Sequence, residues 1–346
     1  MRAVPVAIDW RPTLSIYASE PFLKAVSDTY GWIGGLDGAG TLQCVLPYTI
    51  VRRGPFQLVR LRVETIPLRE ELGIQQEKAF LNSAIDYFRS IGAHMIIPPT
   101  TNAVFRTYPD GAVAAPYGTY VLDLTQSETA LWSNLNASHR RKVRLAMKEG
   151  VQIQSGIEFI AAAYDLIRNT FKRSHLGFMR YNAFQRYVVG LKDNIKIFMA
   201  THRGVMQACL VVPFSQHSAY YVYGGSLAEP SRGATNLLHW EAIRHFADLG
   251  VRSYDFVGVR IDPEKNSKQE GLMLYKQRFG GRLVKGYLWK YPLRRLPFAL
   301  YSVAVGFTRN GDIIDQERRK LDPVATADIC APEQTPDHTA NHSALQ

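Results

Sequence analysis

The stretch Tyr220-Tyr-Val-Tyr-Gly-Gly-Ser226 opens the part of the sequence that decides the fold. The aromatic and β-branched residues over 219–223 predict a buried strand that ends at a glycine pair. Apolar residues then recur at helical spacing from Leu237 onward, and Gly250 takes the position of a glycine that ends a helix. This order predicts a strand followed by a crossover helix.

A second strand and a second helix complete the unit. Residues 251–257 predict the strand, and residues 268–279 predict the helix, which ends at Gly280-Gly281. Polar groups that gather near the strand ends of such a β-α-β unit are typical of a ligand cleft. The sequence therefore predicts a binding site near these strand ends.

These pieces resemble the acyltransferase half of the Fem-type peptidoglycan aminoacyltransferases, within the GNAT-fold N-acyltransferase superfamily. The family shares a Tyr-x-Tyr-(Gly/Ala)-Gly-Ser strand, a helix that ends in Gly, a Tyr-Asp strand and a (Phe/Tyr)-Lys-x-x-Phe-Gly helix end. All four occur here in that order, and the resemblance covers residues 126–290. It implies an α/β (α+β) fold of duplicated GNAT-like domains, in which mixed sheets are flanked by helices.

Two internal echoes point to a duplication independently of this resemblance. Gln43-Cys-Val-Leu-Pro-Tyr48 is echoed by Gln207-Ala-Cys-Leu-Val-Val-Pro-Phe214, and Ala84-Ile-Asp-Tyr-Phe-Arg-Ser-Ile-Gly-Ala93 by Ala242-Ile-Arg-His-Phe-Ala-Asp-Leu-Gly-Val251. The echoes come in the same order, which indicates two copies of one α/β domain. We expect an N-terminal GNAT-like domain over 1–125, a C-terminal GNAT-like acyltransferase domain over 126–290, a helical extension over 291–321 and a disordered tail over 322–346.

The composition is that of a globular protein with a basic balance. The chain has 346 residues, 46% of them hydrophobic, and a formal net charge of +11 at pH 7. This charge favours an anionic partner such as RNA, a phosphorylated intermediate or an anionic membrane surface, or it serves solubility alone. Three separated cysteines predict neither a disulfide framework nor a zinc site. The N-terminus lacks the apolar core of a signal peptide, so we expect a cytoplasmic protein, with membrane association as a further option.

A cluster of cations lies at the junction of the two predicted domains. Arg140, Arg144 and Lys148 are four residues apart, so they line one face of a predicted helix. One interpretation is an RNA or phosphate contact, which the resemblance favours because Fem-type proteins carry a similar basic helix. The other is a solvated face whose cations lie favourably near a helix C-terminus.

The apolar segment Leu293–Phe307 predicts a short helix between Lys290 and Arg309. It falls short of the roughly 20 residues that a membrane-spanning helix needs. The pattern favours a helix docked on the core, and an interfacial anchor is the alternative.

Familiar catalytic templates are absent from the sequence, which has no His-Glu-x-x-His, no Cys-x-x-Cys, no Walker loop and no Gly-x-Ser-x-Gly elbow. Aminoacyl transfer needs no protein nucleophile, because the donor ester is already activated and the acceptor amine attacks it directly. The protein has to align the two reactants and stabilise the negative charge that develops. A lysine, a tyrosine hydroxyl and cations for phosphates suffice.

The resemblance implies roles for individual residues. Lys276 matches the family lysine implicated in holding the donor tRNA 3′ end, and Tyr275 keeps an aromatic ring for stacking. Tyr223 matches a pocket tyrosine, and Arg180 matches an arginine that grips substrate phosphates in some members. Asp255 could accept a proton or cap a strand end. The alternative for Lys276 is a lysine on the helix surface, and the alternative for Tyr223 is a tyrosine of the core. We predict Lys276, Tyr223 and Asp255 as catalytic residues, and Arg180, Lys24, Tyr275, Arg140, Arg144 and Lys148 as substrate-binding residues.

The predicted function is transfer of an amino acid from aminoacyl-tRNA to an amine of a UDP-linked or lipid-linked muropeptide precursor, in peptide-bridge formation during cell-wall biosynthesis. We expect a monomer that needs no cofactor or metal. One alternative is an acyl-CoA-dependent GNAT N-acyltransferase that modifies polysaccharides or amino sugars, although Ser231-Arg-Gly-Ala-Thr-Asn236 lacks the spacing of a pyrophosphate turn. A non-catalytic RNA- or glycan-binding protein is another.

Overall fold

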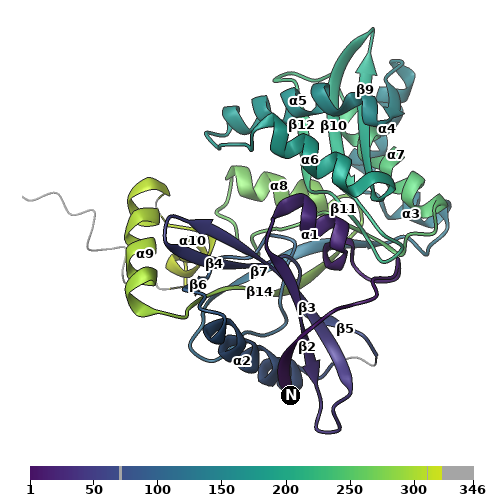
Figure 1. Ribbon diagram of the computed structural model, residues 1–346. Coiled ribbons are helices and arrows are strands. Elements are labelled where there is room, and N and C mark those ends of the chain that lie inside the picture. Colours follow the sequence, from purple (N-terminus) through teal and green to yellow (C-terminus); the bar gives the residue numbers. More distant parts are fainter. Residues whose placement is uncertain (70–71, 310, 322–346) are drawn as a thin grey trace, which may run out of the picture.

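The computed structural model describes residues 1–69, 72–309 and 311–321, and its strands form two sheets (Figure 1). The larger sheet has ten strands in the order β1-β2-β3-β4-β6-β14-β7-β13-β11, with β5 beside β3, and the smaller sheet has the order β12-β10-β9-β8. The predicted fold of mixed sheets flanked by helices is confirmed. The strands are β1 (Arg2–Val6), β2 (Tyr30–Leu36), β3 (Leu42–Arg53), β4 (Phe56–Leu61), β5 (Ile66–Pro67), β6 (Met95–Ile96), β7 (Val113–Asp123), β8 (Gln152–Ser155), β9 (Ile195–His202), β10 (Val205–Pro213), β11 (Ala219–Tyr220), β12 (Tyr223–Ser226), β13 (Ser253–Asp255) and β14 (Arg282–Pro292).

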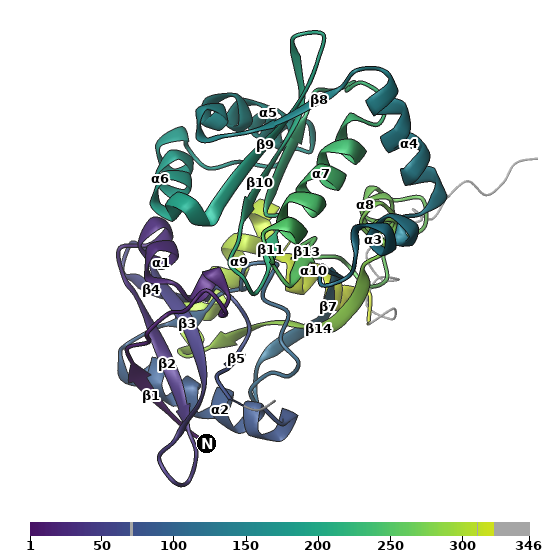
Figure 2. The same ribbon diagram turned by 90° about the vertical axis from the view of Figure 1, so that its right-hand side faces the viewer.

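Helices cover both faces of the smaller sheet (Figure 2). Two helices pack on one face, together with a helix from the N-terminal half, and two others pack on the opposite face. These are α5 (Ile160–Arg173) and α6 (Tyr181–Leu191) with α1 (Glu20–Val26), and α4 (Ala137–Lys148) with α7 (Ala234–Asp248). The remaining helices are α2 (Ile74–Ser90), α3 (Glu128–Asn134), α8 (Lys268–Gln277), α9 (Arg295–Arg309) and α10 (Ile313–Arg319).

Two crossover units of the larger sheet share one organisation. β4 and β6 pair in parallel across α2, and β11 and β13 pair in parallel across α7. Each helix is followed by a glycine with a left-handed backbone, Gly92 at φ 76° and Gly250 at φ 71°. A residue without a Cβ adopts this conformation at little cost, which is why these helices end there. The glycine-ended helices that lead into strands are therefore present in both halves, as the echoes predict.

Strands from both predicted domains share the larger sheet. β14 pairs with β7 along most of its length and with β6 at its C-terminal end. β13 pairs with the other edge of β7. One sheet thus runs through both halves, and the division into two domains at residue 125 stays a prediction.

The single strand predicted over 219–223 is divided in the structure. β11 pairs with β13 in the larger sheet, whereas β12 pairs with β10 in the smaller sheet. Tyr221 and Val222 lie between them, where the chain passes from one sheet to the other. Apolar residues continue through this point, so the hydrophobic pattern cannot show the change of partner. The two sheets separate at this point, beside the end of β13.

α9 and α10 lie within residues 291–321, for which a helical extension is predicted, and β14 extends to Pro292. Phe298 and Tyr301 of α9 pack against Leu58, Met95 and Ile97 at the edge of β4 and β6. The predicted disordered tail lies outside the described residues. Within the described part of the chain, no helix is both long enough and apolar enough to cross a membrane.

Candidate active site

Lys276 lies in the last turn of α8, and its ammonium group contacts the loop after β13. Its Nζ donates hydrogen bonds to the carbonyl oxygens of Val257 and Gly258, the second at 2.8 Å. Both of these residues have positive φ, 53° at Val257 and 29° at Gly258. A β-branched residue rarely adopts this conformation, so the turn is strained, and strain of this kind is common at functional sites. Lys276 is therefore not a free helix-surface lysine.

Asp255 ends β13 and lies buried near Lys276. Its Oδ1 accepts hydrogen bonds from the Thr119 hydroxyl and, at 2.7 Å, from the Val257 backbone N–H. Burial raises the pKa of Asp255 to about 6, although these bonds and the Lys276 charge oppose the rise. Burial also lowers the pKa of Lys276 to about 8, and the Asp255 charge opposes that change. The two groups act on each other, yet no ion pair joins them within the described residues.

Glu64 and Arg62 approach this region from the N-terminal half, directly after β4. Burial raises the pKa of Glu64 to about 8, and the Asp255 charge adds to the rise. Burial lowers the pKa of Arg62 to about 9, while its Nε donates to the Thr49 hydroxyl at 2.8 Å. Neither residue is among the predicted site residues. The available signal is the alternation in Arg60-Leu-Arg-Val-Glu64, which places charged side chains on one side of an extended segment.

Tyr223 opens β12, on the far side of the strand division from Asp255. Its ring lies 6.0 Å from the ring of Tyr187, between centroids, in an aromatic cluster that includes residues of α6. Burial raises the pKa of Tyr223, and the charge of Arg62 opposes the rise. Among the three predicted catalytic residues, the structure thus brings Lys276 and Asp255 together and places Tyr223 beside Arg62.

Tyr275 lies in an aromatic cluster rather than on an open surface. Its ring centroid is 5.2 Å from that of His139, 5.7 Å from that of His239 and 5.3 Å from that of Phe279. These rings belong to the core that α4 and α7 share. The structure gives Tyr275 a packing role, and stacking on a ligand base stays a prediction.

The two predicted phosphate cations are separated. Lys24 lies on the exposed face of α1, where its Nζ is 3.0 Å from the Glu20 carboxylate. The next residue, Ala25, lies against Gly190 near the C-terminal end of α6. Arg180 is exposed at the opposite end, as the N-cap of this 11-residue helix. Because such a helix is about 16 Å long, the structure does not bring the two cations into one site.

The segment that contains Asp255 and Lys276 matches a known family. Residues 133–276 match the family described as acetyltransferase (GNAT) domain. The matched segment includes Asp255 and ends at Lys276. Over these residues, which are less than half of the chain, the protein is similar to a GNAT acetyltransferase domain. The acyltransferase class that the motifs predict is thereby confirmed for this domain.

Part of the chain is similar to the lipid II:glycine glycyltransferase of Staphylococcus haemolyticus, with 27% identity over 112 residues. The similarity covers 30% of this chain and 27% of that protein, so it spans about a quarter of the length of this relative. The predicted resemblance of the GNAT domain to Fem-type transferases is confirmed.

Solved structures share the fold at low identity. The structure of FemX matches with a TM-score of 0.63 and 15% identity, over 88% of this chain and 99% of that chain. The C-terminal domain of a putative lysylphosphatidylglycerol synthetase from Agrobacterium fabrum matches with a TM-score of 0.50 and 13% identity, over 83% and 96%. At these identities the likeness concerns the fold.

Within the GNAT domain, α4 does not present the predicted face of three free cations. The Arg140 guanidinium donates hydrogen bonds to carbonyl oxygens at the end of α3, including that of Ser133 at 2.7 Å. The Arg144 guanidinium lies over the Trp132 ring, 5.3 Å from its centroid. Arg140 therefore connects α3 to α4, and its role as a phosphate ligand stays a prediction. Arg144 and Lys148 remain exposed.

The start of α7 is the place where an acyl-CoA-dependent GNAT domain would hold a pyrophosphate. Gly233 caps this helix at φ 81°, and a Cβ at this position would overlap the carbonyl oxygen of Lys142 in α4. Ser231, in the same turn, donates its backbone N–H to the Gln207 side chain at 2.9 Å. The turn is therefore already in contact with other parts of the protein, namely the Lys142 carbonyl and the Gln207 side chain. The absence of a Cβ at Gly233 permits α4 to pack on α7.

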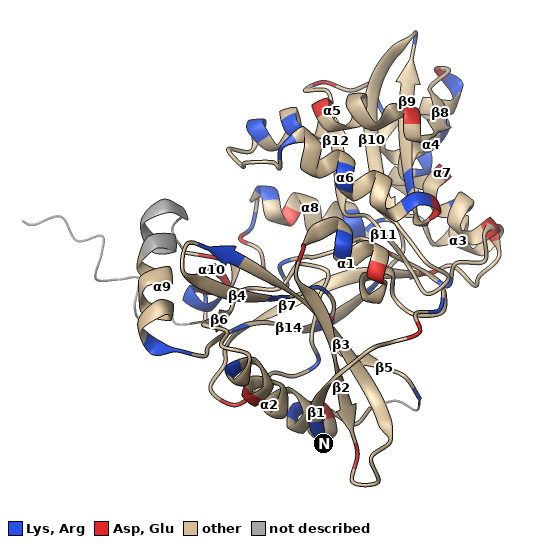
Figure 3. Cartoon of the chain, in the orientation of Figure 1, with Lys and Arg blue, Asp and Glu red and all other residues tan. Residues whose placement is uncertain are grey.

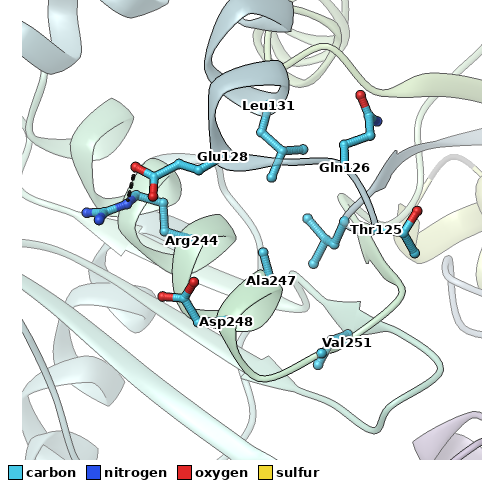
Figure 4. Close-up of a pocket in the computed structure, with 10 residues that line it drawn as sticks. Thr125, Gln126, Glu128, Leu131, Arg244, Ala247, Asp248 and Val251 are labelled. Carbon is cyan, nitrogen blue, oxygen red and sulfur yellow. Dashed lines mark ion pairs between the residues drawn. The ribbon is translucent and has the colours of Figure 1, made fainter.

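A separate pocket lies at the opposite end of β13 from Lys276 (Figure 4). It has a volume of about 290 Å³ and is lined by residues that precede β13 or follow β7, together with parts of α3 and α7. Glu128 and Arg244 form an ion pair of 2.8 Å beside it. Because Val251 lines the pocket and Asp255 lies at the other end of the strand, this pocket is not part of the candidate active site.

Proposed function

We propose that this chain transfers an aminoacyl group from aminoacyl-tRNA to an amine of a peptidoglycan precursor in cell-wall biosynthesis. The observation that carries the proposal is the arrangement of Lys276 and Asp255 at the end of β13 in the GNAT domain. The similarity to a lipid II:glycine glycyltransferase supports the choice of acceptor. The proposed protein is a cytoplasmic monomer without a cofactor, and its acceptor is a UDP-linked or lipid-linked muropeptide.

Asp255 is the proposed acceptor of the proton that the attacking amine must lose. Both of its hydrogen bonds end on Oδ1, and Oδ2 makes none with the described residues. A carboxylic acid with a pKa of about 6 is mostly ionised at pH 7 and can still hold a proton during the reaction. The amine nitrogen then bonds to the ester carbonyl carbon.

Lys276 is the proposed source of positive charge for the oxygens of the ester. An ammonium group has three N–H donors, and the carbonyls of Val257 and Gly258 take two of them. The third can bind the carbonyl oxygen, which becomes negative as the amine attacks. When the bond from carbon to the ribose oxygen breaks, Lys276 can give that oxygen a proton, because its pKa of about 8 is close to neutral.

The other exposed cations are proposed to bind substrate phosphates. Lys24 lies on α1, Arg180 is the N-cap of α6, and Arg144 and Lys148 lie on α4. Tyr223 is proposed to bind the acceptor, together with the neighbouring Arg62.

A second candidate function is N-acyl transfer from acyl-CoA, since the matched family is described as an acetyltransferase domain. The packing of α4 against Gly233 at the start of α7 favours the tRNA donor over CoA. The two functions differ in the donor, so one assay separates them.

The experiment incubates the purified protein with a muropeptide precursor and either charged tRNA or acetyl-CoA, and measures the product by mass spectrometry. We expect the mass of an aminoacyl residue on the muropeptide, and its loss when the charged tRNA is digested with ribonuclease beforehand. Transfer from acetyl-CoA alone would establish the second function. No product with either donor across UDP-linked and lipid-linked acceptors would overturn both.

A further inference from the structure

The outer face of α9 is apolar along its first turns. Leu296, Leu300 and Val303 are 80%, 61% and 58% exposed, and their spacing places them on one face of the helix. Phe298 and Tyr301, on the other face, pack against the core. The helix is therefore docked on the protein, as the favoured interpretation of the sequence predicts, and still exposes an apolar stripe. We call Leu296, Leu300 and Val303 the α9 stripe.

The α9 stripe is unusual on this protein. Single exposed apolar side chains are common on soluble proteins, whereas adjacent ones mark interaction surfaces. Three of the five most exposed large hydrophobic residues in the described chain belong to the stripe. Leu296 and Leu300 of the stripe also line a groove of about 480 Å³, together with Phe56, His94, Arg294, Arg295 and Pro297.

Four exposed arginines border the stripe. Arg294 and Arg295 lie at the start of α9, and Arg52 and Arg53 end β3 at the tip of a hairpin. Figure 3 shows basic residues at both places beside α9. The hairpin reaches the helix, because Val51 and Phe56 pack on the same apolar cluster as Phe298 and Tyr301 of α9. None of the four arginines has an ion-pair partner within the described residues.

The acidic residues of α10 do not cancel this charge. Asp312 and Asp315 are bound to Lys290, with distances of 2.7 and 2.6 Å from its Nζ to their carboxylates. Glu317 is bound to Arg260 at 2.9 Å. Lys320 also binds Glu317, at 2.9 Å, so three cations balance the three carboxylates. The arginines around the stripe therefore leave a positive surface.

We propose that the α9 stripe and its four arginines bind the surface of an anionic phospholipid bilayer, with α9 lying in the plane of the interface. A helix of 15 residues is about 22 Å long, which is shorter than the roughly 30 Å hydrocarbon core. The leucines enter the acyl-chain boundary, and the guanidinium groups bind lipid phosphates. Charge complementarity favours a bilayer over a second copy of this basic chain.

The same helices are connected to the candidate active site. Arg260 follows Gly258 by two residues and donates to the Gln316 side chain of α10 at 2.7 Å. Lys290 joins α10 to β14 through its two carboxylate partners. Membrane binding through α9 therefore fixes α10 and, through Arg260, the loop that contacts Lys276 relative to the bilayer. This consequence rests on the proposed function, and it selects a lipid-linked acceptor over a UDP-linked one.

The test is flotation of the full-length protein with vesicles of phosphatidylcholine, with and without phosphatidylglycerol. We expect flotation with the anionic vesicles, weakened by salt. The exchange of Leu296→Gln together with Leu300→Gln should weaken it about tenfold or more, and Arg294→Gln with Arg295→Gln should weaken it about fivefold per charge. A matched control, Val205→Gln with Leu249→Gln, changes two exposed apolar residues elsewhere and should float as the wild type does.

Absence of flotation with anionic vesicles would overturn the inference, and so would unchanged flotation of the stripe variant. A wild-type dimer that the stripe variant converts to a monomer, without vesicle binding, would show that the stripe binds a second copy. Melting temperatures establish that each variant is folded. Flotation does not depend on catalysis, so a protein that floats and transfers nothing would refute the proposed function and leave membrane binding standing.

Discussion

Two buried carboxylates, one in each half of the molecule, have different partners. Glu77 in α2 is 1% exposed and forms an ion pair with Arg106, whose Nε and second guanidinium nitrogen are 2.9 and 2.8 Å from it. Asp255, at the end of β13, is also buried, at 7% exposed, but it accepts its hydrogen bonds from a hydroxyl and a backbone N–H. The nearby Lys276 binds carbonyl oxygens instead of this carboxylate.

Glu77 and Arg106 therefore form a structural ion pair, whereas Asp255 and Lys276 form a candidate active site. Arg106 and Glu77 neutralise each other, so they stabilise the N-terminal half and offer little charge to a ligand. Asp255 and Lys276 are held apart by neutral partners, so each keeps a charge that a substrate can use. The shifted pKa values of both residues, about 6 and about 8, bracket neutral pH, as acid–base catalysis requires.

The largest expected effect is at Lys276. Lys276→Met keeps the length of the side chain and removes the charge, so turnover should fall by about 10²–10³, equivalent to roughly 3–4 kcal/mol of transition-state stabilisation. Lys276→Arg should recover only part of it, because the guanidinium is wider and directs its donors differently. The measurement is turnover at saturating donor, with the melting temperature as control. Wild-type turnover of Lys276→Met would remove this residue from the site.

The counterpart of that experiment is Arg106→Met. It leaves the Glu77 carboxylate buried without its cation. The free energy of unfolding should fall by about 2–3 kcal/mol, which is less than the roughly 3–5 kcal/mol for a fully buried pair, because Arg106 is 37% exposed. Turnover per folded molecule should stay as in the wild type. Denaturant unfolding measures the change in the free energy of unfolding, and the transfer assay measures turnover. If Arg106→Met lowered turnover as strongly as Lys276→Met, the distinction between the pairs would fail.

The sequence predicts those features of the fold and of the candidate site that depend on a local pattern of residues. Glycines at the ends of two helices indicate the repeated crossover, because the left-handed backbone there requires them. The motif around Lys276 and the strand that ends at Asp255 indicate the site. Each of these features is contained in a short segment of sequence, so it can be recognised without knowledge of the tertiary structure.

Other features depend on contacts between distant segments. The division between β11 and β12 arises because two sheets share one apolar stretch, which has no signal of its own. Glu64 joins the site only because β4 lies in the same sheet as β13. Arg140 has the spacing of a basic helical face, but the end of α3 lies within reach and its carbonyls bind the guanidinium. Periodicity cannot distinguish such a residue from a solvated cation.

The smallest expected effect is a pH dependence of transfer. With Asp255 ionised above about pH 6 and Lys276 charged below about pH 8, kcat/KM should be greatest between these values and fall about tenfold per pH unit outside them. Asp255→Asn should remove the acid limb, and Lys276→Arg should move the alkaline limb upward. Stability has the opposite dependence at Asp255: its folded pKa lies above the usual 3.8, so the native state binds the proton more tightly and stability falls as pH rises from about 4 to about 6. Unfolding measured across that range should show a smaller fall in Asp255→Asn than in the wild type, because Glu64, whose pKa burial also raises, contributes in both. An acid limb that persists in Asp255→Asn would assign proton transfer to another group, and Glu64 would then be the residue to change.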